Sequence, residues 1–216
     1  MGQSESHLAS FDGGVLVHRE VVAPLRLLQE RAERDGVELK VASGFRGFET
    51  QLNIWNQKAQ GKRKLLDSEG RPLDFQKLSE DEIISAILRW SALPGASRHH
   101  WGTDLDVFDA KALKKGVRLQ LVPQEAAPGG PFAEFSRWLG ENLLEEKFFR
   151  PYSRDLGGVS PEWWHISFEP VSKPYFEKLS LSLLEKTLAA TELEKKNLVL
   201  KRLPEIYKKY IVNITQ

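Results

Sequence analysis

Apolar residues at helical spacing mark several amphipathic helices along the chain. Leu25, Leu28 and Ala32 fall on one face of a helix that we expect to begin near Pro24. Ser79-Glu80-Asp81-Glu82 is a capping box, in which the serine and the third following residue satisfy each other's free backbone N–H groups. Helices are predicted over 24–34, 48–60, 79–93 and 132–144, and after Pro174 to the end, with a break at Pro204.

Alternating or continuous apolar residues predict short strands between these helices. The strands are expected over 37–42, 105–108, 117–122 and 162–168. Strands and helices do not alternate regularly, which favours an α+β fold over a doubly wound parallel sheet.

Composition and charge exclude several classes of protein. The 31 basic and 30 acidic residues give a net charge of +1, which argues against nucleic acid or an anionic membrane as the partner. The absence of cysteine removes disulfides and thiolate metal sites. No apolar run approaches the roughly 18 residues of a membrane span. The first ten residues lack the pattern of a signal peptide, so we expect a cytoplasmic protein, or a periplasmic one if a leader was removed.

Two carboxylates fall on one face of a predicted strand. In a strand over 103–108, Leu105 and Val107 point to one side and Asp104 and Asp106 to the other. The aliphatic pair is expected to face the core, and the carboxylates a cleft.

Two histidines can join this cleft. Gly102 allows a sharp bend that brings His99 back beside Asp106, and His165 comes from a distant strand. Two imidazoles and a carboxylate, with a fourth position left for water, form a catalytic zinc site. Glu162 is the candidate base that accepts a proton from water and passes it to the leaving amine. Residues 162 and 165 point to opposite faces in a straight strand, so Glu162 must precede the strand.

Arg46 is a candidate anchor for a substrate carboxylate. It follows a predicted strand and lies between Gly44 and Gly47, which let a substrate approach the backbone. A guanidinium group binds a carboxylate through two parallel hydrogen bonds, as an exopeptidase acting on a free C-terminus requires.

Each of these residues also has an ordinary interpretation. Arg46 can form a surface ion pair, His99-His100 can belong to a polar loop, Glu162 can end a strand, and Trp163-Trp164 can pack in the core. His7 and His18 are expected to face solvent. The joint occurrence of the other residues favours the catalytic interpretation.

Three motifs resemble the VanY-type D-alanyl-D-alanine carboxypeptidases, a family that includes L,D-carboxypeptidases and some phage L-alanyl-D-glutamate endopeptidases. The family patterns are SGYRS followed by Gln, SxHxxGxAxD, and ExWH. The matching residues are Ser43-Gly44-Phe45-Arg46 with Gln51, then Ser97, His99, Gly102 and Asp106, then Glu162, Trp164 and His165.

The resemblance implies a role for each matched residue. His99, Asp106 and His165 are expected to bind Zn²⁺, with Glu162 as the catalytic base. Arg46 is expected to hold the terminal carboxylate of the substrate, with Gln51 and Ser97 beside it. The fold is expected to be a small central antiparallel sheet flanked by helices. A zinc peptidase domain would span 1–173, with the motifs in 37–168, and 174–216 would be a helical extension.

The chain departs from the family pattern at several places. Asp104 replaces a small apolar residue, so that it either adds negative charge near the metal or orients a ligand imidazole. Trp163 replaces a proline ahead of the strand. The insertion over 61–77 and the tail after Pro174 match nothing in the family.

The sequence leaves several functions open. The first hypothesis is a zinc carboxypeptidase that removes the terminal D-alanine of peptidoglycan stem peptides or muropeptides, with L,D-cleavage of tetrapeptides preferred to D,D-cleavage of pentapeptides. A peptidoglycan-binding module without catalysis is the alternative. The locally basic segment 194–210 is interpreted as a solvated helix face, with nucleic-acid or membrane contact as the lesser option.

Overall fold

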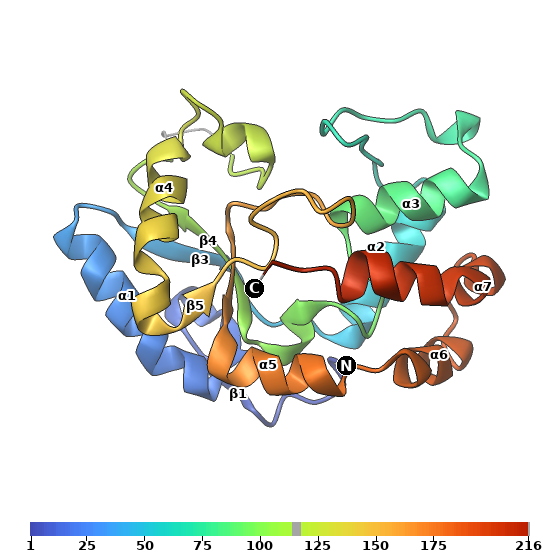
Figure 1. Cartoon of the computed structure of the whole chain (residues 1–216), viewed down its shortest axis with the longest axis horizontal. Coiled ribbons are helices and arrows are strands. Elements are labelled where there is room, and N and C mark those ends of the chain that lie inside the picture. Colours follow the sequence, from blue (N-terminus) through green and yellow to red (C-terminus); the bar gives the residue numbers. More distant parts are fainter. Residues whose placement is uncertain (114–117, 216) are drawn as a thin grey trace.

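The computed structural model of the chain describes residues 1–113 and 118–215. A four-stranded antiparallel sheet, in the order β3-β4-β6-β5, lies between two groups of helices, and β1 and β2 form a separate pair (Figure 1). The strands are β1 (Leu8–Ser10), β2 (Leu16–His18), β3 (Leu39–Ser43), β4 (Asp104–Asp109), β5 (Phe148–Phe149) and β6 (His165–Phe168). The predicted α+β class and antiparallel sheet are therefore confirmed.

Helices form a larger part of the described chain than strands do. They are α1 (Val22–Arg34), α2 (Phe48–Ala59), α3 (Glu80–Trp90), α4 (Ala133–Asn142), α5 (Glu169–Lys178), α6 (Leu181–Ala189) and α7 (Lys196–Ile206). A short 3₁₀ helix covers Arg98–Trp101, and a π-helical turn, Tyr207–Ile211, follows α7.

The sheet is apolar on one face and polar on the other. Leu105 and Val107 of β4 and Ile166 of β6 are fully buried in a cluster with side chains of α1 and α4. Because side chains alternate along a strand, the polar residues of β4 and β6 point to the opposite face. That face carries the candidate site.

A second hydrophobic cluster lies beside the sheet. It joins α2 and α3 to α6 and α7, and Trp55, Ile84, Leu188 and Leu203 are among its buried members. In Figure 1 these four helices form the group opposite α1 and α4. The tail after Pro174 is helical as predicted, and it packs against α2 and α3. The predicted boundary at residue 173 falls within α5, and the division into domains stays a prediction.

Three local expectations are wrong. Residues 118–122 form no strand, because Leu121 adopts a left-handed φ of 56°; Val117 lies outside the described residues. Helix α7 runs through Pro204, since burial of Val199 and Leu203 on one face offsets the lost backbone hydrogen bond. His18 is buried, and its Nδ1 accepts a hydrogen bond from the backbone of Glu20.

The predicted capping box is present at the start of α3. Ser79 Oγ accepts from the Glu82 N–H at 3.3 Å, and the Glu82 carboxylate accepts from the Ser79 N–H at 2.8 Å. We expect Ser79→Ala to lower the free energy of unfolding by about 0.5–2 kcal/mol. Urea unfolding measures the change, with the exposed loop residue Ser153 as the control in Ser153→Ala. Equal midpoints for the two variants would exclude a stabilising cap.

Among the described residues, no helix combines the length and the apolar character that crossing a bilayer requires.

Candidate metal centre and substrate pocket

The pairing of β4 with β6 brings two distant residues together. Asp106 and His165 are directly opposite in the antiparallel register. His99 reaches them from the 3₁₀ helix, and Gly102 ends that helix with a φ of 69° before the chain enters β4. A Cβ at Gly102 would lie 2.7 Å from the backbone nitrogen of His18, so the bend requires glycine.

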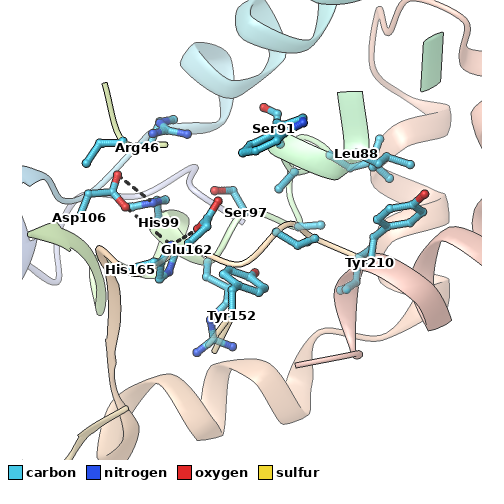
Figure 2. A pocket seen from close by; sticks show the side chains of 18 of the residues that line it. Arg46, Leu88, Ser91, Ser97, His99, Asp106, Tyr152, Glu162, His165 and Tyr210 are labelled. Atoms are coloured by element: carbon cyan, nitrogen blue, oxygen red, sulfur yellow. Dashed lines mark ion pairs between the residues drawn. The ribbon is translucent and has the colours of Figure 1, made fainter. Parts of the chain in front are cut away.

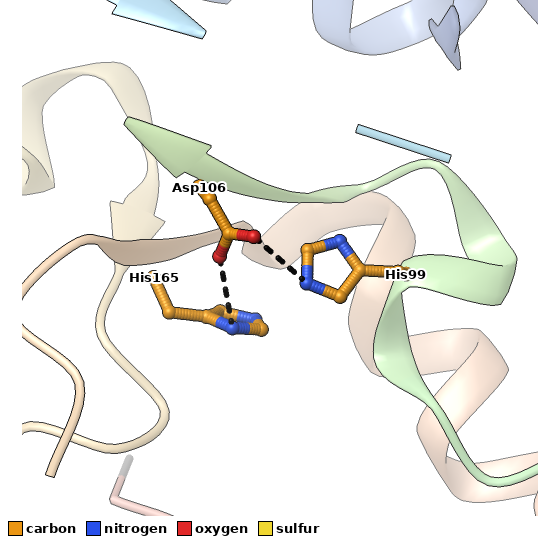
Figure 3. Close-up of side chains that lie close together, drawn as sticks. All are labelled: His99, Asp106 and His165. Atoms are coloured by element: carbon orange, nitrogen blue, oxygen red, sulfur yellow. Dashed lines mark ion pairs between the residues drawn. The ribbon is translucent and has the colours of Figure 1, made fainter. Parts of the chain in front are cut away.

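The three side chains face a common point (Figure 3). His99 Nε2 lies 3.6 Å from Asp106 Oδ2, and His165 Nδ1 lies 3.7 Å from Asp106 Oδ1. One ligand atom from each residue lies within 4.8 Å of the others, and all three residues are buried. Two imidazole nitrogens and a carboxylate oxygen form a donor set that suits zinc and leaves a fourth position free.

Hydrogen bonds on the outer side of each ring orient the two imidazoles. His99 Nδ1 donates to the carbonyl of Gly44 at 2.9 Å, and His165 Nε2 donates to the Asp104 carboxylate at 3.0 Å. A carbonyl or carboxylate partner requires the proton on that nitrogen. In the neutral form of each imidazole, the lone pairs of His99 Nε2 and His165 Nδ1 are therefore directed to the point where the three side chains meet, and this arrangement fits a bound cation.

Glu162 lies before β6, as the spacing to His165 requires. Its Oε2 is 3.0 Å from His165 Nδ1, and its backbone N–H donates to the Tyr152 carbonyl at 2.9 Å. The Glu162 side chain is 14% exposed, so it borders the cluster of His99, Asp106 and His165 and still reaches the cavity.

The pKa values of the cluster reflect burial and crowded charge. Burial, with the nearby Glu162 and Asp104 carboxylates, raises the pKa of Asp106 to about 7. Burial lowers the pKa of His165, but hydrogen bonds to Asp104 and Glu162 outweigh it and raise the value to about 10. Burial and the Arg46 charge hold the pKa of His99 well below its usual range. Perturbation by burial and specific partners together is typical of functional sites.

Arg46 lines the same cavity from the segment after β3. Its Nη1 donates to Gln51 Oε1 at 3.0 Å, and the Gln51 amide donates to the Ala92 carbonyl at 2.7 Å. The backbone of Arg46 is held on both sides, because its N–H donates to the His99 carbonyl and its carbonyl accepts from His100 Nδ1. Gln51 is fully buried, so its contact to Arg46 is a supporting one.

A cavity of about 210 Å³ connects these groups. Figure 2 shows Arg46 and the cluster of Asp106, His99 and His165 at one end, with Glu162 and Ser97 beside them. At the other end lie Leu88 of α3 and Tyr210 of the π-helical turn. The cavity therefore lies between the polar face of the sheet and the helical group.

Two tyrosines of this cavity were not among the candidate residues. Tyr152 packs edge-on against the His165 ring, with centroids 5.1 Å apart, and burial raises the pKa of its hydroxyl. Tyr210 belongs to the tail, far along the chain from every motif. Neither lies in a motif with a fixed spacing, so no signal in the sequence points to them.

Comparisons with known proteins agree with this geometry. The profile of the family described as "VanY: D-alanyl-D-alanine carboxypeptidase" matches residues 14–171. An uncharacterised protein of Haemophilus influenzae is 35% identical over 122 residues, which are 56% of this chain and 93% of that protein. A D-alanyl-D-alanine carboxypeptidase of Enterococcus faecalis is 30% identical over 186 residues, which are 83% of this chain and 59% of that relative.

Solved structures of VanY-type carboxypeptidases are also similar to this chain. VanYB in complex with D-alanine-D-alanine matches with a TM-score of 0.57 and 25% identity over 89% of this chain and 93% of that one. A VanY mutant in complex with Zn(II) matches with a TM-score of 0.54 and 25% identity over 84% of this chain and 92% of that one. The LdcB LD-carboxypeptidase shares the fold, with a TM-score of 0.54 at 19% identity over 94% of this chain and 78% of that one. The chain belongs to the VanY family of D-alanyl-D-alanine carboxypeptidases.

Proposed function

We propose that the protein is a zinc-dependent carboxypeptidase that removes the terminal D-alanine from peptidoglycan stem peptides or muropeptides. The observation that carries this proposal is the convergence of His99, Asp106 and His165 within 4.8 Å, in one cavity with Glu162 and Arg46. A zinc ion held by three protein ligands lowers the pKa of its water to about 7 and polarises a carbonyl group.

The side chains of this chain then divide the remaining work. Arg46 holds the terminal carboxylate of the peptide, with Gln51 fixing the guanidinium group and Ser97 lining the cavity beside it. Glu162 accepts a proton from the attacking water and delivers it to the amine that leaves. A module that only binds peptides would not need a carboxylate placed 3.0 Å from a ligand nitrogen.

Two bonds are candidates for cleavage. The L,D-bond of tetrapeptides is the first candidate, and its cleavage stays a prediction. The D,D-bond of pentapeptides is the second candidate, favoured by the description of the family and by the Enterococcus faecalis relative.

Mass spectrometry of defined muropeptides incubated with the zinc-loaded protein tests both. Loss of one alanine from a tetrapeptide supports L,D-cleavage, and loss of one from a pentapeptide supports D,D-cleavage. Binding of both peptides in calorimetry without release of alanine would refute the enzyme and favour the binding module.

The role of Arg46 gives a separate prediction. Arg46→Ala removes a charge-assisted bond to the substrate carboxylate, so we expect kcat/KM to fall about 10- to 100-fold, mainly through KM. Peptides with an amidated C-terminus provide the check. Amidated peptides should be poor substrates of the wild type, and Arg46→Ala should lower their kcat/KM little further. Amidation and the substitution each remove the same contact.

The exposed Arg63, in the loop after α2, provides a matched control for the loss of an arginine charge. Arg63→Ala should leave kcat/KM unchanged. Equal losses on free and amidated peptides in Arg46→Ala would show that Arg46 does not hold the carboxylate.

A further inference from the structure

A buried network of polar side chains lies on the Nε2 side of the His165 ring, away from Asp106. Asp104 is its centre and is fully buried. Its Oδ1 accepts from His165 Nε2 at 3.0 Å and from Arg98 Nε at 2.6 Å, and its Oδ2 accepts from Thr103 Oγ1 at 2.8 Å and from Ser167 Oγ at 3.1 Å. Each carboxylate oxygen thus has two donors, and the carboxylate has little freedom to turn.

The register of the sheet places this network against the metal ligands. Asp104 pairs with Ser167 across β4 and β6, and Asp106 pairs with His165 on the same face. The two carboxylates of β4 therefore lie on either side of one imidazole ring. Asp106 lies near Nδ1 at 3.7 Å, and Asp104 accepts from Nε2.

Arg98 binds both the Asp104 carboxylate and the neighbouring Ser167 hydroxyl. Its Nη2 donates to Ser167 Oγ at 2.8 Å while its Nε donates to Asp104. The guanidinium carbon lies 4.9 Å from the centroid of Trp101 and 5.5 Å from that of Phe176, so aromatic rings confine the group as well. A lysine has a single cationic nitrogen and could not reproduce this planar contact.

We propose that Asp104, held by Arg98 and Ser167, is a positioning residue that fixes the His165 ring with Nδ1 facing the metal. The proposal rests on the proposed function, because it assigns His165 as a ligand. Carboxylates that bind the outer nitrogen of a ligand histidine fix its orientation and strengthen its donor atom. Asp104 is therefore a determinant of zinc affinity that reaches the metal only through His165.

The test is the zinc affinity of Asp104→Asn, measured by competition with a chromogenic chelator. The amide keeps the size of the side chain but loses the charge, and half of its polar atoms become donors. We expect zinc to bind about 10- to 100-fold more weakly. Thermal unfolding of the metal-free protein, recorded in parallel, measures the structural cost separately. Asp109→Asn, at the half-buried far end of the same strand, is the control and should leave zinc affinity unchanged.

Arg98→Lys is the second variant and keeps the buried positive charge. It should bind zinc about 10-fold more weakly, because a single ammonium group cannot donate to Asp104 and Ser167 in the way that the planar guanidinium does. Wild-type affinity in a folded Asp104→Asn protein would overturn the inference, even if that protein unfolds more easily. If Asp104→Asn does not fold, wild-type affinity in Arg98→Lys would overturn it. A wild-type protein that binds no zinc would overturn the proposed function as well, so the two failures are distinguishable.

Discussion

Glu162→Gln is expected to lower kcat by about 10²- to 10⁴-fold, the usual contribution of a positioned general base. Glutamine has the size of glutamate but cannot accept the proton of the attacking water. Because Glu162 is not one of the three converging ligands, zinc content should stay near one equivalent. Release of D-alanine, followed by mass spectrometry or a coupled assay, measures the loss.

Loss of turnover with retention of zinc would distinguish the role of Glu162 from that of the proposed zinc ligands. Glu169→Gln, at the exposed start of α5, is a matched control and should keep wild-type activity. Undiminished turnover in Glu162→Gln would remove Glu162 from the mechanism. Loss of zinc together with turnover would instead place this carboxylate among the metal ligands.

Asp106→Asn is expected to weaken zinc binding by more than about 100-fold, beyond the effect of changing an outer hydrogen-bond partner. The amide removes the only negative charge among the three ligands. The same change should stabilise the metal-free protein at neutral pH. Burial raises the pKa of Asp106 to about 7, whereas the unfolded chain keeps the ordinary value of 3.8. Ionising this carboxyl group therefore costs stability in the folded protein.

The raised pKa of Asp106 sets the pH range over which the stability of the metal-free protein changes. Between pH 4 and 7 the folded metal-free protein binds the Asp106 proton more tightly than the unfolded chain does, so its stability falls as the pH rises. Asp106→Asn has no such proton to lose. Its melting temperature should exceed that of the metal-free wild type at pH 8, and the gap should shrink toward pH 4. A gap that is constant with pH, or a less stable variant at pH 8, would contradict this account.

This opposition between stability and metal binding is expected of a functional site. Buried like charges are unfavourable in the free protein, and binding a cation relieves them. Zinc at 100 times its dissociation constant would add about 2.7 kcal/mol to the stability of the wild type. Asp106→Asn should show almost none of this gain.

The approach of His99 to Asp106 was predictable because it follows from local rules. Alternation along β4 fixes which side Asp106 faces, and Gly102 fixes the bend that returns His99. The three-residue offset from His165 also predicted that Glu162 precedes its strand. In each case the relevant residues are close in sequence, or the motif itself carries the spacing.

The rest of the cavity depends on packing between distant parts of the chain. Tyr210 reaches it only because α6 and α7 share a core with α2 and α3, and no spacing in the sequence encodes that contact. The expected break at Pro204 failed for the same reason, since burial of one helix face outweighs a lost hydrogen bond. The Asp104 network could not be derived from the sequence, which left two roles open for this residue. The register that pairs Asp104 with Ser167 favours the role of orienting an imidazole.

Anomalous diffraction at the zinc edge, from crystals grown with zinc, is the decisive test of zinc binding by His99, Asp106 and His165. We expect a single strong peak about 2.0–2.2 Å from His99 Nε2, an Asp106 carboxylate oxygen and His165 Nδ1. A peak elsewhere, or none at this position in zinc-loaded protein, would contradict it.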